Sequence, residues 1–220
     1  MRYRHIIWDW NGTLLDDTWL CVEVLNQLLA AAALRPVTVG QYRDHFGFPV
    51  IQFYEWLGFD FTRHSFDDLS QRFIAAYNAR RYECRLQPGA REALARFHAA
   101  GLPQSVLSAY REDTLREVIA HYGLTHHFTH LSGLDNIHAH GKLDRGRAHL
   151  RTLELHDSPH AVLLIGDTRH DHEVAAALGA DCLLLHHGHM HAGRLNGRGA
   201  PLADTLAEAV EIALAAPAAR

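Results

Sequence analysis

The sequence predicts an α/β protein in which a parallel β-sheet is interrupted by an all-helical insertion. Three observations lead to this prediction. Short apolar runs alternate with helical patterns from residue 87 onward, which is the order expected of βαβ units. One further apolar run precedes them, and the stretch between Asp16 and Leu86 has helical patterns without a convincing strand. A length of 220 residues suits one such core with a modest insertion.

The first predicted strand covers residues 3–8. This run is apolar and rich in β-branched residues, and it stops abruptly at Asp9. A turn-rich stretch follows, in which Asn11-Gly12 is the sharpest break. The chain is therefore expected to leave the sheet directly after Asp9.

The insertion shows several separate helical patterns. They cover residues 18–33, 38–46, 49–57 and 66–81. The first of them ends at Arg35-Pro36, because proline disfavours helix at the residue before it. We therefore expect residues 16–86 to form a helical cap, and residues 1–15 and 87–220 to form the sheet-containing core.

Strands and helices alternate through the second part of the core. The predicted strands cover residues 103–107, 128–131, 161–165 and 182–185, and the predicted helices cover 90–100, 112–121, 145–155, 170–178 and 204–215. Polar residues follow three of the apolar runs, namely Asp9, Ser108 and Asp167. Because ligands of open α/β sheets bind at the carboxyl ends of the strands, these three residues predict one shared site.

Composition excludes several classes of partner. The formal net charge is -4, and acidic and basic residues are mixed along the chain, so we expect neither nucleic acid nor a membrane surface as a partner. The three cysteines, Cys21, Cys84 and Cys182, are scattered and have no metal-ligand spacing. They predict reduced thiols in a cytoplasmic protein. Lys142 is the single lysine of the chain, so any lysine chemistry must use it.

Four short polar motifs occur in order along the predicted core. They are Asp9-Trp10-Asn11-Gly12-Thr13-Leu14, Ser108, Lys142 and Gly166-Asp167-Thr168-Arg169-His170-Asp171. Together they resemble the motifs of the haloacid dehalogenase superfamily. The helical insertion after the first motif resembles the cap of the phosphoglycolate phosphatase-like branch of this superfamily. The resemblance spans about residues 3–185 and implies a Rossmann-like parallel-sheet core with an inserted helical cap.

The resemblance implies a phosphatase, that is, a phosphate-monoester hydrolase that uses Mg²⁺ and forms an aspartyl-phosphate on Asp9. Phosphoryl transfer needs a nucleophile and positive charge, and carboxylates near a phosphate need a hard cation between them. By resemblance, the metal site consists of Asp9, the main-chain carbonyl of Asn11, Asp167 and Asp171. Of these, Asp171 supports the waters of the metal or orients Lys142. By the same resemblance, the phosphate is bound by Thr13, Ser108 and Lys142.

Asn11 departs from the family pattern. Phosphatases of this family have a second aspartate there, which protonates the leaving oxygen and later activates water. Asparagine can do neither, and loss of such a group lowers rates typically 10²- to 10⁴-fold. Three consequences stay open: a slow phosphatase that favours good leaving groups, replacement by His45, His64 or His170, or a phosphate-binding protein with little turnover. We favour weak or substituted phosphatase activity.

Other branches of the family fit less well. Asp167 argues against the dehalogenase branch, and the lysine-free insertion argues against phosphonatase chemistry. Within the cap, Arg43 and His45 are the candidate substrate contacts, and Arg43 could hold a carboxylate. A small phosphorylated metabolite is therefore the expected substrate, with 2-phosphoglycolate first and a sugar phosphate or nucleotide as alternatives. We expect a monomer or a homodimer.

A cluster of histidines follows the last predicted strand. His186, His187, His189 and His191 could bind zinc or nickel. They lie around a glycine turn, however, and show no regular ligand spacing. We therefore expect an exposed loop near the rim of the site.

Overall fold

The computed structural model describes residues 2–135, 141–197 and 199–217. Within these residues six strands form one sheet in the order β5-β4-β1-β6-β7-β8, and neighbouring strands are parallel. The strands are β1 (His5–Trp8), β4 (Gln104–Arg111), β5 (His130–Leu134), β6 (Val162–Gly166), β7 (Asp181–Leu185) and β8 (Leu202–Ala203). The predicted α/β class with a parallel sheet is confirmed.

Helices cover both faces of this sheet, because side chains alternate between the faces along each strand. On β1, Ile6 and Trp8 pack into one hydrophobic cluster and Ile7 packs into another. The first face carries α5 (Ala90–Ala99), α6 (Glu112–His121) and α10 (Leu206–Ala215), and the second carries α7 (Lys142–Thr152) and α8 (Arg169–Leu178). Shorter elements are η2 (Thr125–His127), η3 (Pro159–Ala161) and α9 (Ala192–Leu195).

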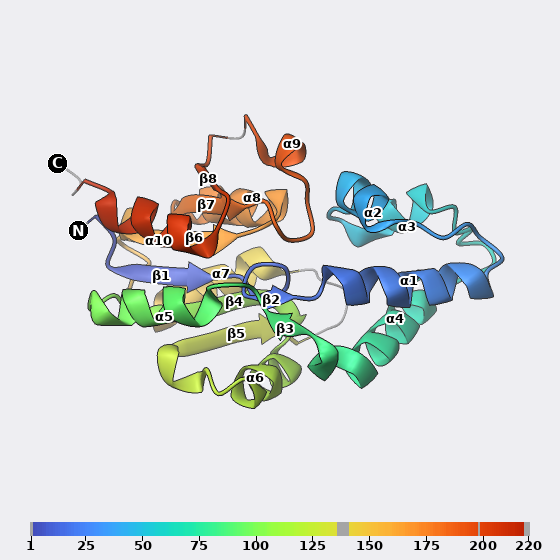
Figure 1. Cartoon of the computed structure of the whole chain (residues 1–220), viewed down its shortest axis with the longest axis horizontal. Coiled ribbons are helices and arrows are strands. Elements are labelled where there is room, and N and C mark those ends of the chain that lie inside the picture. Colours follow the sequence, from blue (N-terminus) through green and yellow to red (C-terminus); the bar gives the residue numbers. More distant parts are fainter. Residues whose placement is uncertain (1, 136–140, 198, 218–220) are drawn as a thin grey trace.

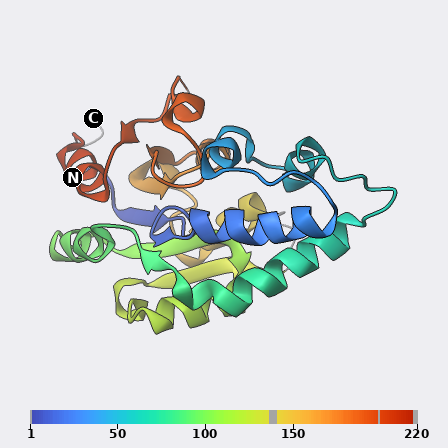
Figure 2. The same ribbon diagram turned by 45° about the vertical axis from the view of Figure 1, so that its right-hand side comes forward.

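The helical insertion lies beyond the carboxyl end of the sheet (Figure 1). The chain enters it through β2 (Leu15–Asp16) and returns through β3 (Arg85–Leu86), and these two strands pair antiparallel. Between them lie α1 (Thr18–Ala31), α2 (Val39–His45), α3 (Val50–Trp56), α4 (Phe66–Arg80) and η1 (Arg81–Glu83). Figure 2 shows α1 running alongside α4. A cap of residues 16–86 on a core of residues 1–15 and 87–220 remains our proposal for the domain boundaries.

The sheet order places the site. β1 lies centrally, with β4 on one side and β6 on the other. The chain first builds the sheet outward through β4 and β5 and then crosses to β6, so the strand order reverses beside β1. Ligands of doubly wound sheets bind at such a switch point. Among the described helices, none is both long and apolar enough to cross a membrane.

Two predicted boundaries are wrong at positions that matter for the site. The strand predicted to end before Ser108 continues as β4 to Arg111, with a shift of pairing register between Leu107 and Arg111. The helix predicted to begin at residue 145 begins at Lys142, after Gly141 in a left-handed conformation (φ 93°). The late part of β4 is held by pairing of Arg111 with Leu134 on β5, and Lys142 at the start of α7 contacts Asp9 and Asp171. Apolar periodicity reports neither of these contacts.

A buried polar chain crosses the core below the site. His5 Nε2 and His149 Nε2 each lie 2.7 Å from Ser105 Oγ, and His149 Nδ1 lies 2.8 Å from Ser132 Oγ. Burial lowers the pKa of His5 to about 4 and that of His149 to about 3. Both imidazoles are therefore neutral in the folded protein at neutral pH.

These two buried histidines make the stability of the protein depend on pH. The folded pKa values lie below the unfolded value of about 6.5, so the unfolded state binds the protons first. The stabilisation is complete above about pH 6.5 and is lost as the pH falls, by about 2 kcal/mol per imidazole at pH 5. Urea unfolding at pH 7 and pH 5 measures this. His149→Gln should flatten the dependence and the exposed His156→Gln should not; equal slopes in both variants would contradict the assignment.

Candidate active site

A buried lysine joins two carboxylates at the carboxyl edge of the sheet. Asp9 directly follows β1, and Lys142 is the first residue of α7. Lys142 Nζ donates to Asp9 Oδ1 at 2.5 Å and to Asp171 Oδ1 at 2.6 Å. All three side chains are buried, so these charge-assisted bonds are only weakly screened by water. The first, third and fourth motifs therefore meet in space.

Asp171 positions the lysine. Its second oxygen accepts hydrogen bonds from Thr168 N at 2.9 Å and from Thr168 Oγ1 at 2.6 Å, as part of the capping box of α8. Gly166 makes room for this carboxylate, because a Cβ there would lie 2.4 Å from Asp171 Cγ. Although burial opposes ionisation, Lys142 keeps the pKa of Asp171 below its ordinary value.

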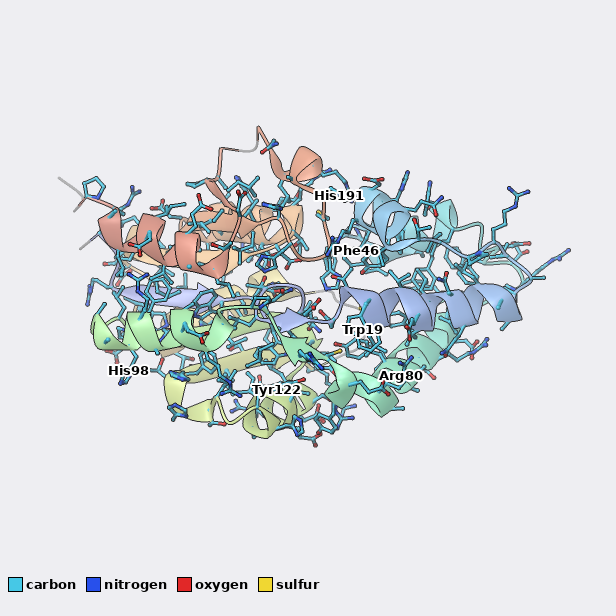
Figure 3. The ribbon with its side chains drawn as sticks, viewed as in Figure 1. Trp19, Phe46, Arg80, His98, Tyr122 and His191 are labelled. Atoms are coloured by element: carbon cyan, nitrogen blue, oxygen red, sulfur yellow. The ribbon has the colours of Figure 1, made fainter. Side chains whose placement is uncertain are left out.

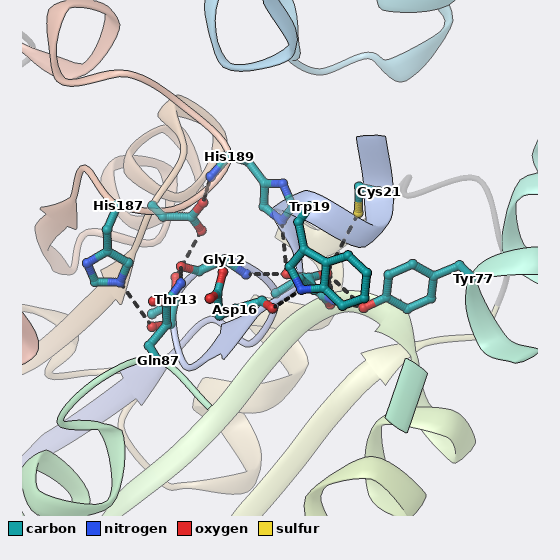
Figure 4. A network of polar contacts seen from close by, with 12 residues as sticks. Gly12, Thr13, Asp16, Trp19, Cys21, Tyr77, Gln87, His187 and His189 are labelled. Atoms are coloured by element: carbon teal, nitrogen blue, oxygen red, sulfur yellow. Dashed lines mark hydrogen bonds and ion pairs between the residues drawn. The ribbon is translucent and has the colours of Figure 1, made fainter. Parts of the chain in front are cut away.

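Asp167 is held from two sides. Thr13 Oγ1 donates to Asp167 Oδ1 at 2.9 Å, and the backbone N–H of His189 donates to Asp167 Oδ2 at 2.6 Å (Figure 4). Cβ atoms at Gly12 and Gly188 would lie 2.4 and 2.1 Å from Asp167 Oδ2. Only glycine fits at these positions. Thr13 thus positions a candidate metal ligand, and its contact with phosphate stays a prediction.

The carboxylates form a donor set that fits Mg²⁺. Side-chain oxygens of Asp9, Asp167 and Asp171 lie within 4.8 Å of one another. Burial pushes the pKa of Asp9 upward, Lys142 opposes this shift, and the neighbouring carboxylates of Asp171 and Asp167 add to it. Burial likewise raises the pKa of Asp167 to about 6. Hard oxygen ligands that repel one another are suited to a divalent cation. Both oxygens of Asp171 accept hydrogen bonds from Lys142 and Thr168, and both oxygens of Asp167 accept from Thr13 and His189 N. The three carboxylates are therefore all kept as candidate ligands.

The side chain of Asn11 is directed toward the start of the cap. Its Nδ2 donates to Asp17 Oδ2 at 2.7 Å and to Tyr77 Oη at 3.0 Å. Asp17 also accepts from Tyr77 Oη at 2.7 Å and from the backbone N–H of Gly12 at 2.9 Å. His189 Nε2 lies 3.4 Å from Asp17 Oδ1. Figure 4 shows this network, which joins the first motif to helix α4 and to the loop after β7.

Asp17 and His189 form a buried ion pair. Despite the opposing effect of burial, Asp17 raises the pKa of His189 to about 9. In turn, against burial, His189 lowers the pKa of Asp17, helped by Asn11 and Tyr77. Asp17 was not predicted as a site residue, because an aspartate in a turn-rich stretch has an ordinary structural explanation. Its position three residues after the end of the first motif is the signal that could have indicated its role.

Comparison with known proteins identifies the family. Residues 6–185 match the family model of haloacid dehalogenase-like hydrolases. The chain belongs to this family. A phosphoglycolate phosphatase of Mesorhizobium japonicum is 30% identical over 192 residues, covering 84% of this chain and 83% of that protein. The family is one of hydrolases, and this relative is a phosphatase.

A second relative shares the haloacid dehalogenase-like fold. The tyrosine-protein kinase PtkA of Mycobacterium tuberculosis is 27% identical over 84% of this chain, and the match spans 62% of PtkA. Its structure superposes with a TM-score of 0.81 at 24% identity, over 98% of this chain and 99% of that one. The structure of a predicted phosphatase from Clostridium acetobutylicum superposes with a TM-score of 0.83 at 17% sequence identity, over 97% of this chain and 99% of that one. These two structures support the fold alone.

A cavity of about 190 Å³ lies between the motif residues of this haloacid dehalogenase-like core and the cap. Asp9, Asn11, Ser108, Lys142 and Asp171 line it. Ser108 is buried, and its Oγ accepts from the backbone N–H of Tyr110 at 3.1 Å. The second motif therefore lies beside residues of the other three motifs at one cavity.

The two predicted cap contacts lie elsewhere. Arg43 donates to the backbone carbonyl of His187 at 2.7 Å, and His45 stacks on the exposed Trp56 with ring centroids 3.8 Å apart. Neither residue lines the cavity. Through this hydrogen bond Arg43 joins the cap to the core. Of the predicted substitutes for the missing acid, His170 alone is among the described residues lining the cavity.

The imidazole rings of the histidine-rich loop contact different partners and do not meet at one site. His186 pairs with Asp204 at 2.7 Å and His191 with Asp44 at 3.7 Å, while His189 faces Asp17. Among the described residues, neither candidate ion cluster includes His186, His187 or His191. The prediction of an exposed loop is wrong for His189, which is buried because it pairs with Asp17 and contacts Tyr42.

Proposed function

We propose that this haloacid dehalogenase-like hydrolase is a magnesium-dependent phosphate-monoester hydrolase that acts through an aspartyl-phosphate on Asp9. The observation that carries the proposal is the buried contact of Asp9 with Lys142, beside Asp167 and at the floor of a cavity. A carboxylate nucleophile, a fixed positive charge and a hard-cation donor set are the parts that phosphoryl transfer requires.

The reaction proceeds in two steps, formation of the aspartyl-phosphate and its hydrolysis. A carboxylate oxygen of Asp9 bonds to phosphorus while the ester P–O bond breaks, and its electron pair leaves with the alcohol oxygen. Asn11 has no proton to give, so the leaving oxygen takes one from water. A water oxygen then bonds to phosphorus, the bond to Asp9 breaks, and the proton of that water passes to solvent. Asp9 regains its carboxylate and phosphate departs.

Charge neutralisation comes from two sources. Lys142 holds the attacking carboxylate and lies where the phosphate oxygens approach it. Bound Mg²⁺ would supply further positive charge to the phosphate, held by Asp9, Asp167 and the main-chain carbonyl of Asn11. Ser108 is the proposed hydrogen-bond partner of the phosphate. A cytoplasmic location and a monomeric or homodimeric state remain predictions.

Two alternatives concern turnover and substrate. The relatives named phosphoglycolate phosphatase make 2-phosphoglycolate a candidate substrate, beside sugar phosphates and nucleotides. Asn11 favours a second candidate function, a phosphate-binding protein with little turnover. Restoring an acidic residue at position 11 distinguishes a phosphatase from a phosphate-binding protein, and a panel of esters distinguishes the substrates.

Asn11→Asp is expected to raise turnover of monoesters with poor leaving groups about tenfold or more. The new carboxyl would lie where Asn11 Nδ2 now lies, 2.7 Å from Asp17 Oδ2. Two carboxyl groups so close share one proton, so the pair would hold a proton for the leaving oxygen. Phosphate release from glycerol phosphate and 2-phosphoglycolate, measured with Mg²⁺ and with EDTA, tests this.

Asn11→Ala is the matched control, since it removes the amide without adding an acid and should give no gain. Magnesium-dependent release by the wild type supports the hydrolase. If the wild type is already fast and Asn11→Asp gives no gain, another group transfers the proton. No release by either protein with Mg²⁺ present would leave the phosphate-binding alternative.

A further inference from the structure

The cavity in front of Asp9 has two chemically different sides. Its core side carries the ionisable groups Asp9, Lys142 and Asp171 together with Ser108. Its cap side is mainly aromatic and includes Tyr42, Phe46, Phe48, Phe53, Phe66 and Phe73. A phosphoryl group on the core side therefore leaves the rest of a substrate against aromatic rings.

These rings form an aromatic wall, in which those of Tyr42, Phe46, Phe48 and Phe53 are in direct contact. Tyr42 stacks on Phe46 with centroids 4.9 Å apart, and Phe53 meets both rings edge-on at 5.5 Å. Phe48 reaches across to the core and stacks on His170 at 4.5 Å. Figure 3 places Phe46 where α2 meets the loop that carries His191. Tyr42 and Phe53 are buried, whereas Phe46 and Phe48 are half-buried and keep surface for a ligand.

The positively charged groups around the cavity already have partners. Of the described residues that line the cavity, Lys142 is bound to Asp9 and Asp171, and His189 is paired with Asp17. His170 stacks on Phe48, and its Nδ1 lies 3.8 Å from Glu173 Oε2. A carboxylate or a second phosphate on the leaving group would be desolvated here without an ion partner, which is strongly unfavourable.

We infer that the cap side of this cavity binds the leaving group as an uncharged aromatic ring, so that the substrates are phosphate monoesters of phenolic or arylalkyl alcohols. The inference rests on the proposed phosphatase function. The cavity of about 190 Å³ exceeds the roughly 150 Å³ that accepts benzene in an apolar protein interior. Offset and edge-to-face contacts with the wall favour a ring over an aliphatic chain.

This substrate class also fits Asn11. A phenol is a far more stable anion than an aliphatic alkoxide, so its departure depends less on a protonating group. Phenolic esters therefore tolerate the absence of an acid in the first motif. Because this advantage is chemical and not a property of the cavity, the test must separate ring binding from leaving-group quality.

The experiment compares benzyl phosphate with propyl phosphate, whose alcohols are similarly poor leaving groups. With Mg²⁺ present, kcat/KM should favour benzyl phosphate about tenfold or more. The non-hydrolysable phenylphosphonate should likewise inhibit more tightly than methylphosphonate. Phe73→Ala, on the aromatic side of the cavity, should reduce both preferences, and Tyr82→Ala, an exposed cap aromatic that contacts His121 away from the cavity, should leave them unchanged.

The experiment distinguishes an absence of ring recognition from an absence of phosphatase activity. Equal kcat/KM for the benzyl and propyl esters, or a preference for 2-phosphoglycolate, would overturn the ring inference and leave the phosphatase intact. Absence of turnover with every ester, including p-nitrophenyl phosphate, would overturn the phosphatase. Calorimetric titration with the two phosphonates would then decide ring recognition by itself, since equal affinities would overturn it and tighter phenylphosphonate binding would support it.

Discussion

Asp9→Asn is expected to lower kcat about 10⁴-fold or more, because an amide cannot serve as the nucleophile. The substitution keeps the shape of the side chain, and its amide oxygen can still accept the hydrogen bond from Lys142. It also removes one charge from a set of crowded buried carboxylates. The fold should therefore survive while turnover is lost. Phosphate release with Mg²⁺ and trapping of a phosphoryl label on the protein measure the two consequences.

The matched control for this experiment is Asp144→Asn. Asp144 lies on α7 close to Lys142 in sequence, but its side chain is exposed and pairs with Arg147. Its loss should leave kcat unchanged and label trapping intact. Retention of a tenth or more of kcat by Asp9→Asn would mean that the nucleophile is another group.

Lys142→Met is expected to lower the free energy of unfolding by about 3–5 kcal/mol and to abolish turnover. Removing one partner of a buried ion pair leaves the other charge uncompensated. Here two carboxylates lose their counter-charge at once, since Lys142 contacts both Asp9 and Asp171. Urea unfolding with EDTA present measures the effect without compensation from Mg²⁺.

A double variant separates charge from packing. Lys142→Met combined with Asp171→Asn removes one of the stranded charges and should recover part of the lost stability, so the two effects should be strongly non-additive. Strict additivity, or a loss below about 1 kcal/mol in the single variant, would show that the carboxylates do not depend on the lysine.

The sequence alone predicted most of the core. Apolar runs that alternate with helical patterns indicated a parallel sheet, and the polar residues at three run ends indicated where the site lies. Asp9 and Asp167 directly follow β1 and β6, as expected. Such features are local, because strand and helix periodicity and the breaks between them depend on neighbouring residues only. The identity of Lys142 as the site lysine followed because the chain has no other.

The tertiary structure decided what depends on residues distant in the chain. Asp17 and His189 belong to unremarkable local sequences, and only the folded chain pairs them. Arg43 was a plausible carboxylate ligand by type, yet its contact with the carbonyl of His187 removes it from the cavity. The aromatic wall likewise arises from α2, α3 and α4 together. Sequence determined the chemistry available at the strand ends, whereas packing between cap and core determined which groups are free to meet a substrate.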